Sequence, residues 1–345
     1  AAYTAAELKG AGFSLAALVT AAYTAANLKA AAYTAAELKG ASFSLAALVT
    51  AGYTATNLKA AVYTATDLKP HFTLAQLKTA QFTALNLKNA QYSLAALVDA
   101  GFNATQLKGA SYSATDLKPS FTLAALVTAG FTAIQLKDAL YSAADLKAAG
   151  FDLVTLVGAG FNATQLRTAP YTATDLKPHF TLAQLKTAQF TALNLKNAQY
   201  SLSELVGAGF NATQLKNANY SAIELNPSFT LAELVTAGFS ATNLKSAGYS
   251  ATQLEPYYPL AHLVTAEFTA TELRAAGFNL DELSTFPFNA TQLKNALYTA
   301  AELKGEDFTL TQLVNAGFTA PQLKNALYTA SDLVGQNNPV GPSGT

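Results

Sequence analysis

The amino-acid sequence predicts an all-α fold: a single rod-like solenoid of about 34 short helices, with roughly three helices per superhelical turn. Three observations support this fold class. A segment of about ten residues, called the repeat below, recurs from residue 1 to about residue 335. Each repeat carries the residue types of a helix start, and a wider apolar face returns every two or three repeats. Repeats of fixed period indicate one continuous solenoid rather than the two or three globular domains that 345 residues would suggest.

The first repeat, Ala1–Gly10, shows why each repeat is expected to form a helix. Thr4 stands where an N-cap belongs and Glu7 follows three residues later, so the two can satisfy each other's backbone N–H groups. Tyr3 before the cap and Leu8 after it are placed to form a hydrophobic staple. Alanines, which favour helix, lie between them. Glycine often follows the repeat and can adopt the left-handed conformation that ends a helix. Each repeat should therefore be a helix of roughly six residues and a tight corner.

The same positions are occupied throughout. The third position is Phe or Tyr and the eighth is Leu in all 34 repeats, while the fourth is Ser, Thr, Asn or Asp except at Pro259. A helix of about six residues is too short to persist alone in water. Neighbouring repeats must therefore bury the Leu and the aromatic ring, each contributing about 1.5–3 kcal/mol when fully buried. We expect these two positions inside and the ninth-position lysines outside.

A second periodic pattern of apolar residues predicts a wider apolar face on some of the helices. In some repeats the fifth position is Leu and the ninth is usually Val, and residues four apart share a helix face. We call these the Leu/Val repeats; several of them follow a shortened repeat and begin with Pro, as at Pro70 and Pro178. Their apolar side chains can be additional core, or an apolar strip on one edge of the rod that binds a second rod. Val127, Val157 and Val235 are candidates for such a strip.

The repeats predict the domain boundaries. Residues 1–335 should form one repeat solenoid, and residues 336–345 a polar tail or linker rich in Gly and Pro. Residues 61–96 and 169–204 are nearly identical, so internal duplication preserved the register. The chain opens on Ala1 rather than Met, in phase with the repeat, and we expect it to be a piece of a longer product.

Composition limits the classes of function. Lys plus Arg equals Asp plus Glu at 21 each, so no net charge attracts nucleic acid. No long apolar segment interrupts the repeats, so membrane insertion is not expected. Cys is absent, which excludes disulfides and thiolate metal sites. A charged fraction of 12% favours self-association over solubility. The lack of Cys, Met and Trp is compatible with an extracellular, virion or cell-surface location, although repetition of one unit explains it equally well.

Candidate chemical groups have plain structural explanations. Acids and amides at the seventh position, such as Glu7, are at the third helical residue, where capping accounts for them. His71, His179 and His262 lack a second histidine at metal-ligand spacing, so we expect them at the surface. No nucleophile motif or phosphate loop is present. We therefore expect no catalysis, no cofactor and no metal.

Two further patterns point to surface chemistry. Asn-Ala-Thr triplets begin at Asn103, Asn162, Asn211 and Asn289, and match the glycosylation acceptor, but these Asn residues are at the N-cap position. Thr-Ala-Thr spacing is also seen on ice-binding surfaces, but here one Thr of each pair is needed as a cap. We expect capping in both cases, with ice binding as a remote alternative.

The Gly-Phe-Thr-Ala-x-x-Leu-Lys-x-Ala unit resembles the decapeptide arrays of highly repetitive proteins of microbes and large viruses. The resemblance covers nearly the whole chain. It implies a scaffold of short-helix repeats, and it implies no particular activity.

The leading functional hypothesis is structural: a subunit of a filament, fibre or surface appendage that assembles end to end with copies of itself. The first repeat is identical to Ala31–Gly40 and has no polar capping sequence, so Tyr3 and Leu8 would be exposed at one end. Leu333 and Val334 offer an apolar surface at the other. The alternative is a monomeric scaffold that binds another protein through one face.

Overall fold

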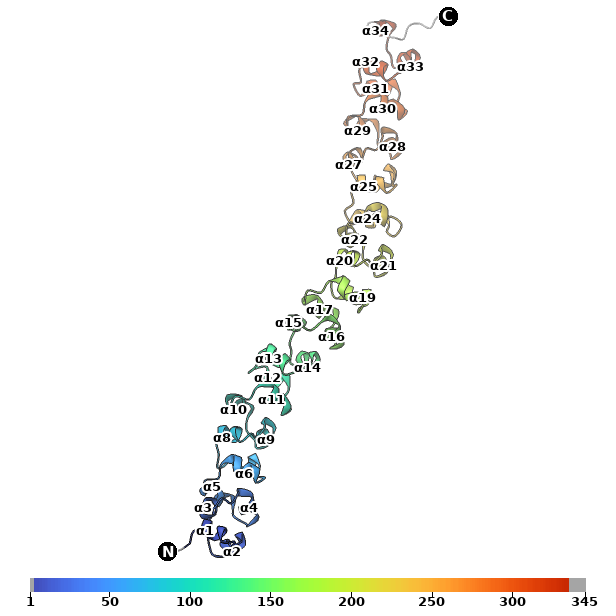
Figure 1. Cartoon of the computed structure of the whole chain (residues 1–345). Helices are drawn as coiled ribbons and strands as arrows, with labels where there is room; N and C mark the ends of the chain where they lie inside the picture. The colour runs from blue at the N-terminus through green and yellow to red at the C-terminus, as the bar shows by residue number, and fades with distance from the viewer. Residues whose placement is uncertain (1–2, 335–345) are drawn as a thin grey trace. The chain divides into compact units, whose positions relative to one another are not determined.

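A computed structural model describes residues 3–334, and within that range every regular element is a short α-helix. The described residues divide between Tyr171 and Thr172 into two compact blocks. We call them the N-terminal block and the C-terminal block, and each is considered by itself (Figure 1). The predicted all-α class and the number of about 34 helices are confirmed for the described residues.

The helices of the N-terminal block follow one another at the spacing of the repeat. They are α1 (Ala5–Gly10), α2 (Leu15–Thr20), α3 (Ala25–Ala30), α4 (Ala35–Gly40), α5 (Leu45–Thr50), α6 (Ala55–Ala60), α7 (Ala65–Leu68), α8 (Leu74–Thr79), α9 (Ala84–Asn89), α10 (Leu94–Asp99), α11 (Ala104–Gly109), α12 (Ala114–Leu117), α13 (Leu123–Thr128), α14 (Ala133–Asp138), α15 (Ala143–Ala148), α16 (Leu153–Gly158) and α17 (Ala163–Thr168).

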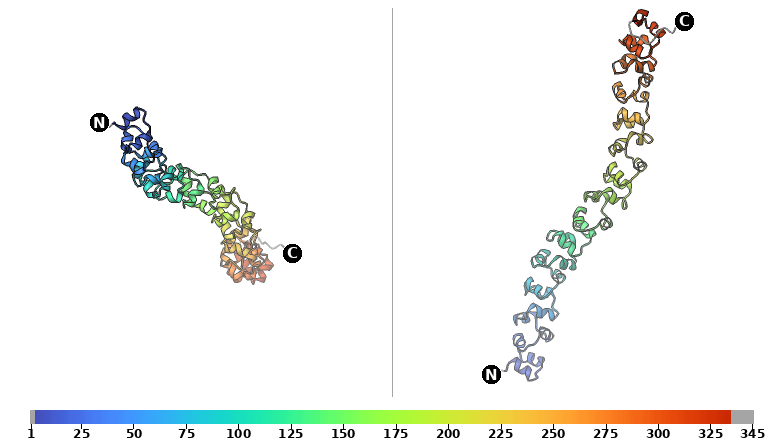
Figure 2. Two further views of the ribbon diagram at one scale, coloured as in Figure 1. Left: turned by 90° about the horizontal axis from the view of Figure 1, so that it is seen from below. Right: turned by 45° about the horizontal axis from the view of Figure 1, so that its top comes forward.

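The C-terminal block continues the same series, and both views in Figure 2 show its short helices joined by tight corners. Its helices are α18 (Ala173–Leu176), α19 (Leu182–Thr187), α20 (Ala192–Asn197), α21 (Leu202–Gly207), α22 (Ala212–Asn217), α23 (Ala222–Leu225), α24 (Leu231–Thr236), α25 (Ala241–Ser246), α26 (Ala251–Leu254), α27 (Leu260–Thr265), α28 (Ala270–Ala275), α29 (Leu280–Ser284), α30 (Ala290–Asn295), α31 (Ala300–Gly305), α32 (Leu310–Asn315), α33 (Ala320–Asn325) and α34 (Ala330–Val334).

Reciprocal capping starts the helices, as the sequence predicts. At α4 the backbone N–H of Glu37 donates to the Thr34 hydroxyl oxygen at 3.2 Å, and the Thr34 backbone N–H donates to the Glu37 carboxylate at 2.7 Å. Thr34 has extended backbone angles, φ −81° and ψ 158°, so the chain enters the helix at a defined bend. At α27, where Pro259 is the cap residue, the side-chain hydrogen bond is missing.

The corners between helices do not require glycine. Gly12 has φ 90°, as the sequence predicts for a left-handed corner residue. The equivalent corners elsewhere hold Ala, Ser, Gln, Leu or even the β-branched Val62, whose φ is 62°. Each non-glycine residue in this region costs about 1–2 kcal/mol. The hydrogen bonds of the corner, such as Tyr63 N–H to the Leu58 carbonyl at 3.1 Å, hold the conformation at that cost.

Five helices have only four residues, and each precedes a proline. They are α7, α12, α18, α23 and α26, followed by Pro70, Pro119, Pro178, Pro227 and Pro256. Proline has no N–H to continue the helical hydrogen bonds, so the helix stops and the repeat is shortened. The next repeat therefore begins one residue earlier than it would after a repeat of ten residues.

Within each block the core is a row of the eighth-position leucines. Leu28, Leu38 and Leu58 have no solvent exposure, and fifth-position alanines such as Ala35 are also buried. No polar or charged residue between residues 3 and 334 is buried. The aromatic rings line this row, and most are buried or half-buried, as the sequence predicts.

Contacts between repeats skip one helix. α1 packs on α3, α4 on α6 and α7 on α9, and the C-terminal block has the same pattern in α18 with α20 and α31 with α33. Side-chain hydrogen bonds extend slightly further, from a lysine to a carbonyl 21 to 23 residues later. Contacts thus join repeats that are two to three repeats apart along the chain, which agrees with the expected roughly three helices per superhelical turn. Each block is a regular solenoid.

Two predictions about extent are not tested. One continuous rod through residue 335 stays a prediction, because the two blocks are described separately. The predicted tail, residues 336–345, lies outside the described residues.

The capping carboxylates predict how stability depends on pH. Hydrogen bonds from the Thr34 backbone N–H and hydroxyl lower the pKa of Glu37, and the same bonds from Thr64 lower the pKa of Asp67. A pKa lower in the folded chain than in the unfolded chain adds stability above the unfolded pKa, and that stability is lost as the pH falls. We expect the melting temperature to fall as the pH drops below ~4.

The check is a series of thermal melts from pH 7 to pH 3. A Glu37→Gln, Asp67→Asn variant is the control, because it keeps neutral caps of the kind found in other repeats, and its pH dependence should be weaker. Equal pH dependence in the two proteins would contradict this explanation.

Candidate functional site

Every basic residue of the chain occupies the ninth position of a repeat, and these side chains form one repeated contact. The Lys39 ammonium group donates to the Ala61 carbonyl at 2.9 Å and to the Val62 carbonyl at 3.3 Å. It also lies 4.0 Å from the centre of the Tyr63 ring. Ala61 is the C-cap of α6, two repeats after α4. We call this contact the lysine clamp: an ammonium group on the C-terminal carbonyls of the helix two repeats later and on the following aromatic ring.

The clamp recurs through both blocks. Its lysine donors are Lys9, Lys29, Lys39, Lys59, Lys69, Lys78, Lys88, Lys108, Lys118, Lys137, Lys147, Lys177, Lys186, Lys196, Lys216, Lys245, Lys294 and Lys304. Arg274 makes the same contact, on the Ala296 carbonyl and over the Tyr298 ring.

The ninth-position lysines lie at the surface, as the sequence predicts: none of those described is buried, and Lys39 is exposed. The sequence analysis did not identify the partners of their ammonium groups. A helix C-terminus carries unpaired carbonyls and partial negative charge, so it attracts a cation. The face of an aromatic ring attracts the same cation. One observation in the sequence could have indicated a shared contact, since the lysines and arginines all occupy one position of the repeat.

The residue type at the seventh position depends on where the repeat lies relative to a Leu/Val repeat, and the sequence analysis did not recognise this. Repeats just before a Leu/Val repeat mostly carry an acid there, as at Glu37 and Asp67, whereas repeats just after one mostly carry an amide, as at Asn57 and Gln106. The acids lie near the clamps, since the Lys9 ammonium contributes to the lowered pKa of Glu37 and Lys39 to that of Asp67. The acids are thus concentrated in the repeats that precede a Leu/Val repeat.

The groups weighed for metal binding and glycosylation lie where capping and surface exposure place them. Between residues 3 and 334 no three His, Cys, Asp or Glu side chains come together as a metal site would require. The three histidines are exposed, as the sequence predicts. The Asn103 side-chain oxygen accepts the Gln106 N–H at 2.9 Å, and the other Asn-Ala-Thr sites begin with the same cap, at Asn162, Asn211 and Asn289.

The predicted self-association residues lie in three different settings. Tyr3 is 70% exposed, and Leu8 is half-buried. In α34, Leu333 is half-buried and Val334 is 84% exposed.

The Leu/Val strip is neither full core nor fully exposed. Val127, Val157 and Val235 are each half-buried, on α13, α16 and α24 respectively. Half-burial fits both additional core and an apolar strip on the edge of the rod, so it does not distinguish the two interpretations.

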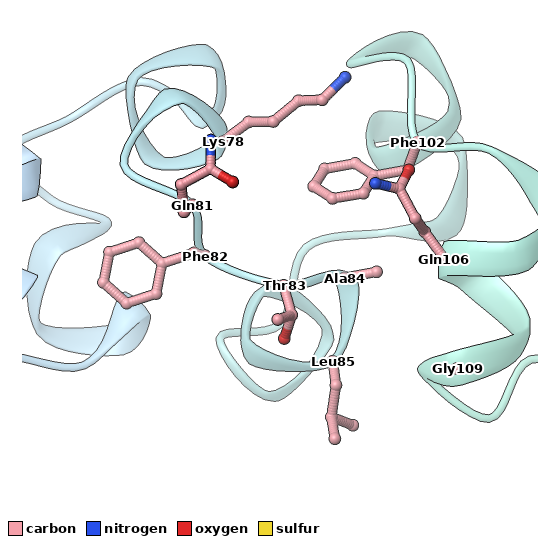
Figure 3. A pocket seen from close by; sticks show the side chains of 9 residues that line it. All are labelled: Lys78, Gln81, Phe82, Thr83, Ala84, Leu85, Phe102, Gln106 and Gly109. Carbon is pink, nitrogen blue, oxygen red and sulfur yellow. The ribbon is translucent and has the colours of Figure 1, made fainter.

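A groove recurs beside the clamps. One such groove, of 530 Å³, lies between α9 and α11 (Figure 3). Its walls include Lys78, Phe82, Phe102 and Gln106, while Leu85 points away from them. Grooves of 440 and 350 Å³ occupy equivalent positions between α28 and α30 and between α31 and α33. Most of the aromatic rings that line these grooves are buried.

Comparisons with known proteins agree with the repeat architecture. The family model described as "Decapeptide repeat region" matches residues 2–71 and 119–179. These two segments are decapeptide repeat regions, which confirms the resemblance predicted from the sequence. The search of curated proteins and the search of solved structures each found no match. No helix between residues 3 and 334 is long and apolar enough to cross a membrane.

The clamp predicts a local loss of stability on removal of one ammonium group. Lys39→Met keeps an apolar stem of similar length but leaves the Ala61 and Val62 carbonyls without their cation. We expect the free energy of opening of α6 to fall by about 1 kcal/mol. Amide hydrogen exchange of residues 55–62 measures this change.

Lys324→Met is the matched control, because Lys324 makes no clamp to any described residue. It should leave exchange in its neighbours almost unchanged. Equal effects of the two substitutions would contradict the proposed role of the clamp.

Proposed function

We propose that this chain is a non-catalytic structural repeat protein whose copies associate end to end in a filament, fibre or surface appendage. The observation that supports the proposal is that one repeat sequence is buried only where other repeats pack on it. Residues 1–10 and 31–40 have the same sequence. Tyr3 is 70% exposed whereas Tyr33 is 8% exposed, and Leu8 is half-buried whereas Leu38 has no exposure.

The exposed side chains of α1 are those that interior repeats use to pack on one another. Burying such a Leu or aromatic side chain is worth about 1.5–3 kcal/mol. A further layer of the same solenoid would supply the complementary surface. In α34, Val334 is 84% exposed.

Charge supports the same function. Nearly all cations are held in clamps within the array, and the charged fraction is only 12%. A contact between two different ends of one chain is heterologous, and without closure it produces an open filament.

The direct test is the size of the purified 345-residue chain at increasing concentration, followed by light scattering and electron microscopy. The chain should form filaments that lengthen with concentration. Tyr3→Lys with Leu8→Lys should abolish this growth, because it places two charges in the proposed contact. Circular dichroism should show that the remaining repeats stay helical.

A matched control places the same charges elsewhere. Val62 and Leu140 are 81% and 84% exposed in corners of the N-terminal block, and Val62→Lys with Leu140→Lys should leave filament growth intact. A wild-type chain that stays monomeric at high concentration would contradict end-to-end association. The grooves between α9 and α11 and at the two equivalent positions would then favour the second candidate, a monomeric scaffold that binds a protein partner.

Lateral association through the Leu/Val strip is a separate prediction. Val127, Val157 and Val235 are half-buried, and other repeats carry Lys at the same position. Replacing the three by Lys should leave the chain folded, with a small change in melting temperature, and should separate filaments that pair side by side. Electron microscopy and thermal melts measure the two effects. A sharp fall in melting temperature would show that the strip is core, because it would mean that charge had been buried.

A further inference from the structure

Repeats with Val at the ninth position have no lysine clamp, and among the repeats that end in a four-residue helix the clamp is also replaced in two layers of the C-terminal block. The five four-residue helices α7, α12, α18, α23 and α26 end in the same way, with a C-cap residue at the ninth position followed by proline. In α7, α12 and α18 that residue is Lys69, Lys118 and Lys177. In α23 it is Asn226, and in α26 it is Glu255.

Backbone geometry is the same in all these helices, so only the side chain changes. Lys177 has φ −51° and ψ −39°, and Glu255 has φ −49° and ψ −43°. α18 packs on α20 as α26 packs on α28. The two layers are therefore a matched pair within one block.

The clamp of Lys177 is complete. Its ammonium group donates to the Ala198 carbonyl at 3.0 Å and to the Gln199 carbonyl at 2.9 Å. It lies 4.2 Å from the centre of the Tyr200 ring. A cation thus neutralises the C-terminal end of α20 and joins it to α18.

Asn226 replaces the ammonium group with neutral hydrogen bonds. Its side-chain amide donates to the Ala247 carbonyl at 2.9 Å, and its oxygen accepts from the Tyr249 hydroxyl at 2.6 Å. The link between α23 and α25 is retained without a charge.

Glu255 has no such compensation. Its carboxylate makes no hydrogen bond within the described residues, and no described group donates to the carbonyls of Ala276 and Gly277, which end α28. One bond near this position, from the Thr252 hydroxyl to the Ala275 carbonyl, is long at 3.4 Å. A negative side chain therefore stands at the position from which a cation elsewhere holds the negative end of a helix, so the contact changes from attractive to repulsive.

We propose that the layer between α26 and α28 is a built-in opening point, which separates more readily than the corresponding layer between α18 and α20. Apolar packing of α26 on α28 is retained, so the layer is closed in the resting molecule. The absence of the clamp lowers the cost of separating it. In a solenoid each repeat is stabilised by its nearest neighbours, so a weakened contact favours local opening at that layer.

Hydrogen–deuterium exchange of the intact chain, analysed by mass spectrometry, tests the proposal. Amides of residues 270–277, around the end of α28, should exchange roughly tenfold faster than those of residues 192–199, around the end of α20. Glu255→Lys supplies the missing cation and should slow exchange in residues 270–277 until the two segments match. Glu255→Gln removes the repulsion without adding a clamp, and its exchange should be intermediate.

The converse substitution keeps the test independent of any one variant. Lys177→Glu should transfer fast exchange to residues 192–199 and leave residues 270–277 unchanged. Equal exchange of the two segments in the wild-type chain would overturn the proposal. Failure of Glu255→Lys to slow residues 270–277, in a chain whose circular dichroism matches wild type, would overturn it as well.

Discussion

Helices of four to six residues cannot hold themselves together in water, and this constraint shapes the whole molecule. Each helix here exists because its leucine, its aromatic ring and its C-terminal carbonyls find partners in other repeats. The leucine row removes apolar surface from water, and it is uniform enough that the interior leucines have essentially no exposure. A chain of many short helices has many helix C-termini with unpaired carbonyls, and the lysine clamps neutralise the partial negative charge of these ends. Apolar packing and the lysine clamps therefore both join repeats that lie two to three repeats apart along the chain.

The fold could be predicted from the sequence because its signals are local. Thr4 and Glu7 lie three residues apart, and a cap needs nothing else to be recognised. The leucine and aromatic positions follow from the same phase. The corners were only partly predictable. Glycine at position 12 favours a left-handed corner, but Val62 adopts the same conformation although valine has no preference for it. There the packing of the flanking helices overrides the residue's own conformational preference.

The contacts that matter for candidate function were less predictable, because they depend on superhelical geometry. A lysine on a short amphipathic helix is normally placed at the surface, and Lys39 is exposed there, but that reasoning did not identify the partners of its ammonium group. Its partners, Ala61 and Val62, come close only when the helices turn at between two and three repeats per turn. The division into an acidic and an amide face, seen at Glu37 and Asn57, was readable in the sequence but has meaning only once the faces are known. For the same reason Glu255 looks unremarkable as a charged surface residue, and its position becomes informative by comparison with Lys177.

The central claim is that contacts between repeats, and not the local sequence, sustain the helices. The most direct measurement is far-UV circular dichroism of the intact chain beside a synthetic peptide of residues 31–40, under the same conditions. The chain should be strongly helical and should lose its helix in a concerted transition on heating, and the peptide should be unstructured at every temperature. A helical peptide, or an intact chain with a β-type spectrum, would contradict the account.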